Sequence, residues 1–359
     1  MSLDDFPRLR LLNQALDQTD LRDPADIVRH LGAVQAQDYL GALWALGIRT
    51  RGATEQHVER AIADRAIVRT WPMRGTLHFV PAEDARWMLA LLTPRVIAST
   101  AARYLQLELN DGVFARSVKI LQRALEGGGR LTRPALYALL EAEGIGTAGS
   151  RGLHILAHLA QQGLICFGPR EGKQPTVVLL DEWVPQPRRL APDEALAELT
   201  RRYFTSHGPA TAHDFAWWSG LTLREVKVGL EACPELEKET NEGRTWWFKT
   251  PRRRRRRNSP GAWLLPPFDE YTVAYRDRSA VVEARFAARA SAGGMLHPLV
   301  VIDGRVRGTW RRTLATGGVR IDAKPFSRLS KTDWKTIAAA AERYGEFLGA
   351  PVSLARGRY

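Results

Sequence analysis

Two glutamines separated by one residue are the first candidates for chemistry in this sequence. If the backbone there is extended, Gln35 and Gln37 project from the same side and can hold one water molecule or one ligand oxygen between them. If the backbone is helical, the two side chains diverge to different faces. Asp38 is placed to cap a helix over residues 39–46, which puts both glutamines in the connection before that helix. The alternative interpretation is a pair of solubilising glutamines at a helix end.

The chemistry open to two amides is narrow. An amide has no useful pKa, so it cannot deprotonate a nucleophile as a general base does. It can orient a water molecule or stabilise a charge. The substrate must therefore already carry a good leaving group. N-alkylated purines meet this condition, because the cationic base departs from the sugar through an oxocarbenium-like state that a held water can trap.

A second polar group is predicted on a strand near residue 76. Arg74, Thr76 and His78 alternate along it, so their side chains share one face. We treat these three residues, together with Asp38, as secondary candidates for the site. The alternative for His78 is a structural histidine whose hydrogen bonds are satisfied inside the fold.

An acidic pair, Asp269 and Glu270, stands out in a basic protein. We expect these carboxylates to bond backbone amides or arginines such as Arg276 and Arg278 rather than to attack a sugar. The tryptophan-rich segment 215–218 is expected to be core.

Most familiar active sites have no counterpart in the sequence. It lacks His-Glu-x-x-His, Gly-x-x-x-x-Gly-Lys, Gly-x-Ser-x-Gly and any His/Cys cluster with metal spacing, so we expect neither a metal nor another cofactor. Cys166 and Cys233 lie far apart, which argues against a disulfide framework and fits a reducing cytoplasm. We recognise no signal peptide and no apolar run long enough to span a membrane.

Length and charge point to several domains and a polyanionic partner. A chain of 359 residues suggests about two to four domains. The net charge is +13, and arginine supplies most of the positive side. Arginine favours bidentate contact with phosphates, so nucleic acid is expected ahead of a membrane surface. The alternative is a basic protein from an arginine-rich proteome.

The elements that must position these residues fall into a repeated order. Helices followed by two strands, at 66–71 and 74–80 around Pro72 and Met73, have the order of a winged helix. The order recurs twice, which indicates tandem duplication. The predicted winged-helix domains are 1–100, 101–188 and 189–250.

The chain changes character after the third repeat. Residues 251–261 contain six consecutive arginines, Arg252 to Arg257, and should form a mobile arm that follows a phosphate backbone, or a solvated linker. Residues 262–359 are predicted to form a small β-barrel-like domain, or a curved sheet, closed by a terminal helix from Lys331 to Leu348. The predicted fold class is α+β.

The sequence resembles the winged-helix DNA glycosylases of the AlkZ/YcaQ type over nearly its whole length. The resemblance rests on Val34 to Tyr39, Thr70 to His78, Leu265 to Tyr271 and Tyr275 to Arg278. It implies three tandem winged helices and a β-barrel around a concave basic surface, and removal of alkylated bases, including bulky adducts and, in some members, interstrand crosslinks. The family's catalytic motif is Gln-x-Gln in the AlkZ branch and Gln-x-Asp in the YcaQ branch. Gln35 and Gln37 therefore correspond to the catalytic pair of the AlkZ branch, with Asp38 displaced by one position from the alternative carboxylate.

The resemblance also implies a β-hairpin that probes the DNA minor groove. The best match is the turn at Asp303-Gly304 with Arg305, Arg307 and Arg311 beside it, in competition with the third wing and with Arg252, Arg253 and Arg254. We expect a cytoplasmic monomer that binds double-stranded DNA carrying alkylated bases. The rival hypothesis is a non-catalytic tandem winged-helix protein, either a transcription regulator or a lesion shield.

Overall fold

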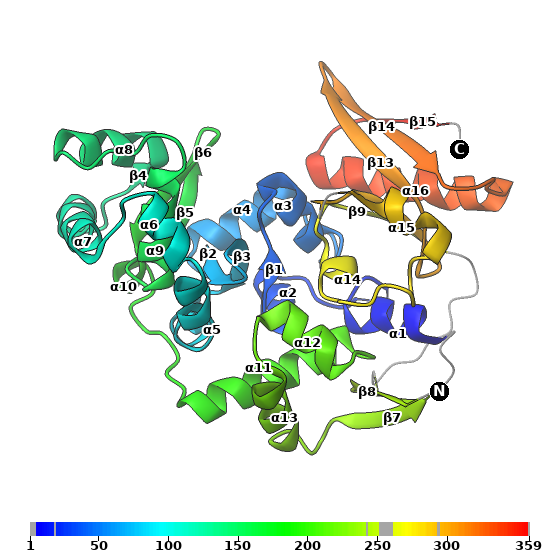
Figure 1. The fold of residues 1–359 in the computed structure, drawn as a ribbon. Helices are drawn as coiled ribbons and strands as arrows, with labels where there is room; N and C mark the ends of the chain where they lie inside the picture. The colour runs from blue at the N-terminus through cyan, green and yellow to red at the C-terminus, as the bar shows by residue number, and fades with distance from the viewer. Residues whose placement is uncertain (1–4, 18, 242, 251–260, 293–294, 358–359) are drawn as a thin grey trace. The chain divides into compact units, whose positions relative to one another are not determined.

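The computed structural model describes residues 5–17, 19–241, 243–250, 261–292 and 295–357. The chain forms a mixed α+β fold, which confirms the predicted class, and divides into two compact units (Figure 1). Unit 1 is Met1–Val58 with Ala197–Tyr359, and unit 2 is Glu59–Leu196. Among the described helices, none has the length and apolarity that a membrane span requires.

The N-terminal segment of unit 1 contains three helices and one short strand. They are α1 (Phe6–Asn13), α2 (Pro24–Leu31), β1 (Val34–Gln35) and α3 (Tyr39–Gly47). Helix α2 begins at Pro24, and the Asp23 side chain accepts a hydrogen bond from the Ala25 amide at 2.9 Å. Proline costs nothing at that position, because its missing N–H would have no partner inside the helix. Helix α4 (Glu55–Ala63) follows and begins directly after Thr54.

The next part of unit 1 follows the element order predicted for residues 189–250. Three helices, α11 (Pro192–His207), α12 (Ala212–Ser219) and α13 (Leu223–Glu231), precede an antiparallel pair, β7 (Glu237–Asn241) and β8 (Arg244–Phe248). Thr211 and Thr222 each form a capping box at the start of α12 and α13. These reciprocal bonds fix where both helices begin.

The C-terminal part of unit 1 is built on a five-stranded sheet in the order β15-β14-β13-β12-β9. Its strands are β9 (Ala262–Leu265), β12 (Leu299–Ile302), β13 (Arg305–Ala315), β14 (Gly318–Pro325) and β15 (Val352–Arg356). The predicted barrel is wrong, because β15 and β9 lie at opposite edges of the described sheet and it does not close. The sequence-based prediction missed β15, which pairs in parallel with β14.

Helices cover this sheet and form the core with it. Helix α16 (Lys331–Leu348) has the predicted bounds and contacts β9 and β15. Leu11 and Leu16 join Trp263 and Leu265 in a buried cluster. The Trp263 indole donates to the Leu16 carbonyl at 2.7 Å, so the N-terminal segment is tied to the sheet. The short elements between β9 and β12 are α14 (Glu270–Val273), η3 (Ala284–Phe286), α15 (Ala287–Ala290), β10 (Ser291–Ala292) and β11 (Met295–Leu296).

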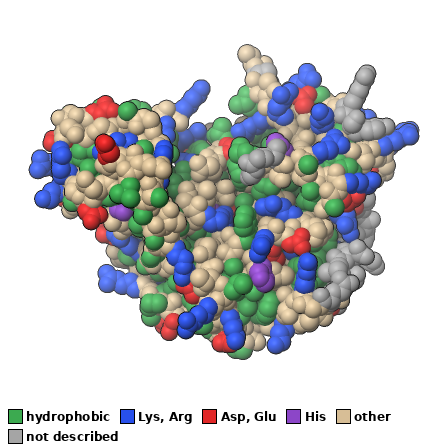
Figure 2. Space-filling model, viewed as in Figure 1, with side chains coloured by type: hydrophobic (Ala, Val, Ile, Leu, Met, Phe, Trp, Pro, Cys, Tyr) green, Lys and Arg blue, Asp and Glu red, His purple; other side chains and the backbone are tan. Residues whose placement is uncertain are grey.

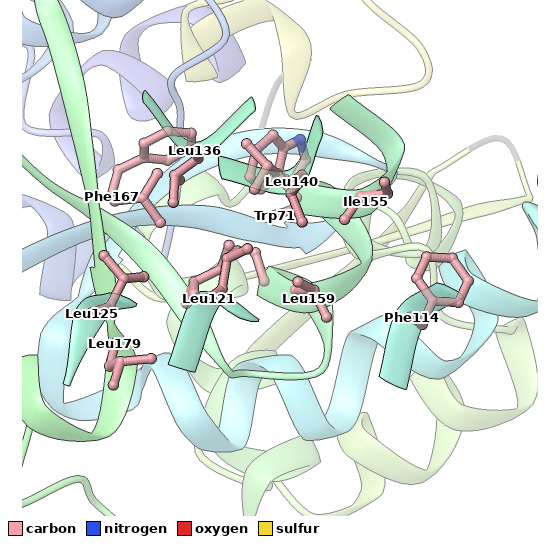
Figure 3. Close-up of a cluster of buried hydrophobic side chains, with 14 of the residues drawn as sticks. Trp71, Phe114, Leu121, Leu125, Leu136, Leu140, Ile155, Leu159, Phe167 and Leu179 are labelled. Atoms are coloured by element: carbon pink, nitrogen blue, oxygen red, sulfur yellow. The ribbon is translucent and has the colours of Figure 1, made fainter. Parts of the chain in front are cut away.

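Unit 2 contains two helical groups and a sheet whose strands follow the order β3-β2-β5-β6-β4. Its elements are β2 (Ile67–Met73), β3 (Thr76–Pro81), η2 (Ala82–Asp84), α5 (Ala85–Ser99), α6 (Ala101–Gln106), α7 (Asp111–Leu125), β4 (Leu131–Thr132), α8 (Arg133–Ala142), α9 (Arg151–Gln161), β5 (Ile165–Glu171), β6 (Gln174–Leu179) and α10 (Leu180–Trp183). Figure 3 shows leucines of α7, α8 and α9 packed with Trp71 and Phe167 of the sheet. This core combines helices α7, α8 and α9 with Trp71 of β2, a residue of the first predicted repeat.

One residue of this core predicts a pH dependence of stability. His158 of α9 is 6% exposed and stacks on Phe114, with ring centroids 3.7 Å apart. Burial lowers the pKa of His158 below its usual 6.5, and Asp111 offsets part of that shift. The folded state therefore binds fewer protons than the unfolded state. The contribution of His158 to the free energy of unfolding is therefore complete above its pKa in the unfolded state. It is lost as the pH falls through its pKa in the folded state.

We expect the free energy of unfolding to decrease between about pH 7.5 and about pH 5.5, and His158→Phe to weaken that decrease. Urea unfolding at a series of pH values measures it. The control is His213→Phe, at an exposed histidine. Identical pH slopes in the wild type and His158→Phe would contradict the assignment.

Candidate active site

The two glutamines of the candidate motif lie where the chain leaves β1 and approaches α3. The backbone is extended at Gln35 and bends at Gln37, so neither residue is helical. The Asp38 side chain accepts a hydrogen bond from the Gly41 amide at 3.1 Å, which confirms the predicted cap of α3. The two amides differ in exposure, because Gln35 is 7% exposed whereas Gln37 is an exposed residue.

Helix α3 is fixed against the C-terminal sheet by one aromatic side chain. The Trp44 indole donates to the Leu264 carbonyl of β9 at 2.6 Å, and its ring packs edge-on against Tyr344 of α16. Gly41 allows the close approach, since a Cβ there would lie 3.3 Å from Pro266. The start of α3, and the motif before it, are therefore held on a rigid surface within unit 1.

The main chain of Gln35 is bound by a buried carboxylate. The Gln35 amide donates to Glu270 Oε1 at 2.9 Å, and the Trp218 indole donates to Oε2 at 2.8 Å. His207 Nε2 lies 3.4 Å from Oε2. Glu270, Trp218 and His207 are fully buried. Both carboxylate oxygens thus have donors from elements distant in the sequence.

The adjacent carboxylate, Asp269, forms a bidentate ion pair with Arg49. The two guanidinium nitrogens lie 2.7 and 2.8 Å from the Asp269 oxygens, and neither side chain is more than 1% exposed. The other N–H groups of Arg49 donate to the Ala45 carbonyl and to both oxygens of Gln14. Every N–H of the guanidinium therefore has an acceptor, as a buried arginine requires. Asp269 also caps α14 by accepting from the Tyr271 amide at 2.9 Å.

The acidic pair therefore has the structural role that was predicted, with different partners. Asp269 pairs with Arg49 rather than with Arg276 or Arg278, and Arg278 donates instead to the Thr272 carbonyl. Trp218 is core as expected, whereas Trp217 of the same segment is 47% exposed.

Sequence reasoning missed Arg49, His207 and Gln14 as partners of the acidic pair. One signal was available. Two acids flanked by Pro-Pro-Phe and Tyr, in an apolar context, require buried donors somewhere in the fold.

The buried tyrosines near this network are neutral hydrogen-bonding groups. Burial raises the pKa of Tyr203, Tyr271 and Tyr275. The Tyr275 hydroxyl donates to the His207 carbonyl at 2.7 Å and accepts from Gln14 at 3.0 Å. At neutral pH these phenols therefore carry no charge that would let them act as bases.

The secondary candidates Arg74, Thr76 and His78 belong to unit 2. Arg74 is not in a strand as predicted. It occupies a turn with φ +53°, next to Gly75, because β2 continues through Pro72 to Met73. The Arg74 guanidinium nevertheless lies 3.2 Å from His78 Nε2. His78 Nδ1 lies 3.0 Å from the Thr76 carbonyl, and the histidine is fully buried. These contacts fit the structural alternative for His78.

The Asp303-Gly304 turn is present, and it is packed rather than projecting. A Cβ on Gly304 would lie 2.7 Å from Pro7, and the Tyr271 hydroxyl donates to the Gly304 carbonyl at 2.6 Å. Arg305 and Arg307 are partly buried on β13, whereas Arg311 is exposed. The competing candidates Arg252, Arg253 and Arg254 lie outside the described residues.

The other end of β13 extends beyond its neighbour. Strand β12 pairs with residues 305–309 of β13, and the rest of β13 pairs with β14 as far as Ala315 and Gly318. Figure 1 shows this hairpin in orange, reaching past the rest of its sheet. Leu314, near its end, is 64% exposed. Figure 2 shows Lys and Arg side chains on the surface of this C-terminal region.

Comparisons with known proteins identify the family. The family model of AlkZ-like DNA glycosylases matches residues 28–347. An interstrand DNA cross-link repair glycosylase of Streptomyces sahachiroi is 30% identical over 325 residues, which cover 84% of this chain and 85% of that protein. The solved structure of Streptomyces sahachiroi DNA glycosylase AlkZ matches the fold with a TM-score of 0.77 at 24% identity, covering 99% of this chain and 100% of that one.

The match of the family model to most of the chain and the identity to the cross-link repair glycosylase agree with one another. The protein is thus a DNA glycosylase and belongs to the AlkZ-like family.

Proposed function

We propose that the protein hydrolyses the N-glycosidic bond of cationic N7- or N3-alkylated purines in double-stranded DNA, with Gln35 and Gln37 as the residues that position the attacking water. The proposed substrates include bulky adducts and interstrand crosslinks, since a relative of this chain is named for cross-link repair. The protein would act as a cytoplasmic monomer in DNA repair or self-resistance.

The observation that carries the proposal is the placement of the two amides. Gln37 is exposed at a bend, two residues after Gln35, whose main chain is held by a buried carboxylate. Neither amide can supply or remove a proton at neutral pH. The site can therefore orient water and stabilise positive charge, but it relies on a leaving group that needs no acid.

The proposed reaction is a hydrolysis at C1′ of the deoxyribose. Water adds to C1′ of the deoxyribose as the bond from C1′ to the purine nitrogen breaks. The electron pair of that bond neutralises the positive charge of the alkylated base. The proton released by water goes to solvent, and the products are a free alkylpurine and an abasic site. The amides would lower the barrier by holding the water in line with C1′.

The proposal assigns the minor-groove contact to the far end of the β13–β14 hairpin instead of the Asp303-Gly304 turn. That turn is covered by Pro7, whereas Leu314 and Arg311 are exposed. An exposed apolar side chain suits insertion between base steps, and Arg311 lies three residues before it on the same strand. Arg311 remains a predicted DNA contact under either assignment.

We expect Arg311→Ala to weaken DNA binding by roughly tenfold at low salt and to reduce the slope of log Kd against log salt by about one. Leu314→Ala should weaken binding without changing that slope, because it removes no charge. Fluorescence anisotropy at a series of salt concentrations measures both. The control is Arg285→Ala, at an exposed arginine paired with Glu283 at 2.8 Å. A salt slope that Arg311→Ala leaves unchanged would rule out the phosphate contact.

The direct test of the proposed function is base release. Duplex DNA carrying one N7-methylguanine is incubated with the protein, the liberated base is identified by mass spectrometry, and the strand is cleaved with alkali at the abasic site. We expect free 7-methylguanine and alkali-dependent scission, with no scission before alkali. Binding of the duplex without any released base would instead support the non-catalytic alternative.

A further inference from the structure

We infer that Glu270 is a positioning residue for the Gln-x-Gln segment, a role that rests on the proposed function of Gln35 and Gln37. Glu270 is fully buried and does not reach the surface that DNA can contact. It acts through the main chain of Gln35, whose amide it binds at 2.9 Å.

The carboxylate joins three elements at one point. Gln35 belongs to β1, Trp218 to α12, and His207 is the last residue of α11. Because Oε1 is occupied by the Gln35 amide and Oε2 by the Trp218 indole, a rotation of the carboxylate would break one bond in order to keep the other. The position of Gln35 is therefore tied to the packing of α11 and α12.

The segment that carries the glutamines is anchored at both ends by successive residues. At the start of the segment, Glu270 binds the Gln35 amide. At the other end of the segment, after α3, Arg49 pairs with Asp269. Glu270 and Asp269 are joined by one peptide bond, so the separation of the two anchors is fixed. Gln14 adds a further link, since its amide donates to the Glu270 carbonyl at 3.3 Å and its oxygen accepts from Arg49 at 3.0 Å. Gln37 lies between these two anchors.

The role requires a carboxylate. Gln35 and Trp218 each present an N–H, so the residue between them needs two acceptor oxygens. A carboxamide has one oxygen, and in either orientation its NH₂ group faces one of the two donors. The substitution Glu270→Gln changes the size of the side chain very little. It nevertheless removes one acceptor, so the side chain cannot make both bonds. The variant could no longer hold the Gln35 amide and the Trp218 indole at the same time, while the surrounding packing stays in place.

The experiment measures single-turnover base release and DNA binding separately. We expect Glu270→Gln to lower the rate at saturating protein by about 10- to 100-fold and to leave the Kd for DNA within about twofold, because small displacements of a positioning group cost rate rather than affinity. The matched control is Trp218→Phe, which removes the other hydrogen bond of the same carboxylate and leaves the Gln35 bond. It should lower the rate by less than about threefold. Equal losses in the two variants would indicate general packing and overturn the inference.

A double-mutant comparison tests whether Glu270 acts through the glutamines. In a Gln37→Ala background, Glu270→Gln should lower the remaining rate by much less than it does in the wild type, because residues that act as a unit are not additive. A full additional loss would overturn the inference about Glu270 while leaving the proposed function intact. A wild-type rate for Gln37→Ala alone would instead overturn the proposed function.

A measurement on the unmodified protein covers the case in which Glu270→Gln does not fold. Hydrogen–deuterium exchange followed by mass spectrometry should show the Gln35 amide exchanging slowly, as a buried hydrogen-bonded amide does. Fast exchange at Gln35 would contradict the bond between Gln35 and Glu270 on which the inference depends.

Discussion

Replacing Gln35 and Gln37 together with alanine should lower the rate of 7-methylguanine release by about 10³-fold or more, while DNA binding stays nearly intact. The physical reason is that, in the proposed mechanism, the amides hold the attacking water and stabilise charge, and alanine has no hydrogen-bonding side chain. Gln37→Ala alone is expected to cost about 100-fold, since one group of this kind is lost and the other remains. Of the two glutamines, Gln37 is expected to contribute more to holding the water, because it is the exposed member of the pair.

The measurement is single-turnover release at saturating protein, together with anisotropy for DNA affinity. Gln56→Ala is the matched control, because Gln56 is an exposed glutamine of α4 outside the motif. It should leave both the rate and the affinity unchanged. Release by the double variant at the wild-type rate would remove the glutamines from the mechanism.

The second large effect is expected on stability, from Asp269→Ala. This change leaves the Arg49 guanidinium fully buried without its carboxylate, which costs about 3–5 kcal/mol of unfolding free energy. It also removes the cap of α14, worth about 1 kcal/mol. The midpoint of thermal unfolding should therefore fall by roughly 10 °C, measured by calorimetry or circular dichroism.

Two variants separate this effect from a general sensitivity to lost ion pairs. Asp322→Ala breaks an exposed pair with Arg320 and should cost less than about 1 kcal/mol. The double variant Asp269→Ala/Arg49→Met removes both buried charges and should recover part of the loss, because no unpaired cation remains. If Asp269→Ala were as stable as Asp322→Ala, the pair with Arg49 would not support the fold.

Signals from neighbouring residues in the sequence predicted where some of the helices begin and end. The cap at Asp38 and the bounds of α16 were predicted because both depend on residues within a few positions of one another. The non-helical connection that carries Gln35 and Gln37 follows from the same cap. The placement of the motif along the chain was therefore predictable.

The contacts that hold the motif were not predictable, because they join distant parts of the chain. Gln35 and Glu270 are 235 positions apart, and Arg49 and Asp269 are 220 apart. Periodicity and capping rules carry no information on such pairs. The barrel was predicted wrongly for a related reason, since only the tertiary fold places β15 beside β14 and leaves β9 at the other edge.

Unit 1 is built from two separate stretches of the chain, and this has a consequence for biosynthesis. Its first 58 residues are completed only by residues that begin at Ala197, and Glu270 is synthesised later still. A nascent chain that has just emerged from the ribosome therefore carries Gln35 and the apolar helix α3 for most of translation without the residues that enclose them. Exposed apolar segments of this kind are targets for chaperones. The contact between Gln35 and Glu270 can accordingly form only late in synthesis, when more than two thirds of the polypeptide has been made.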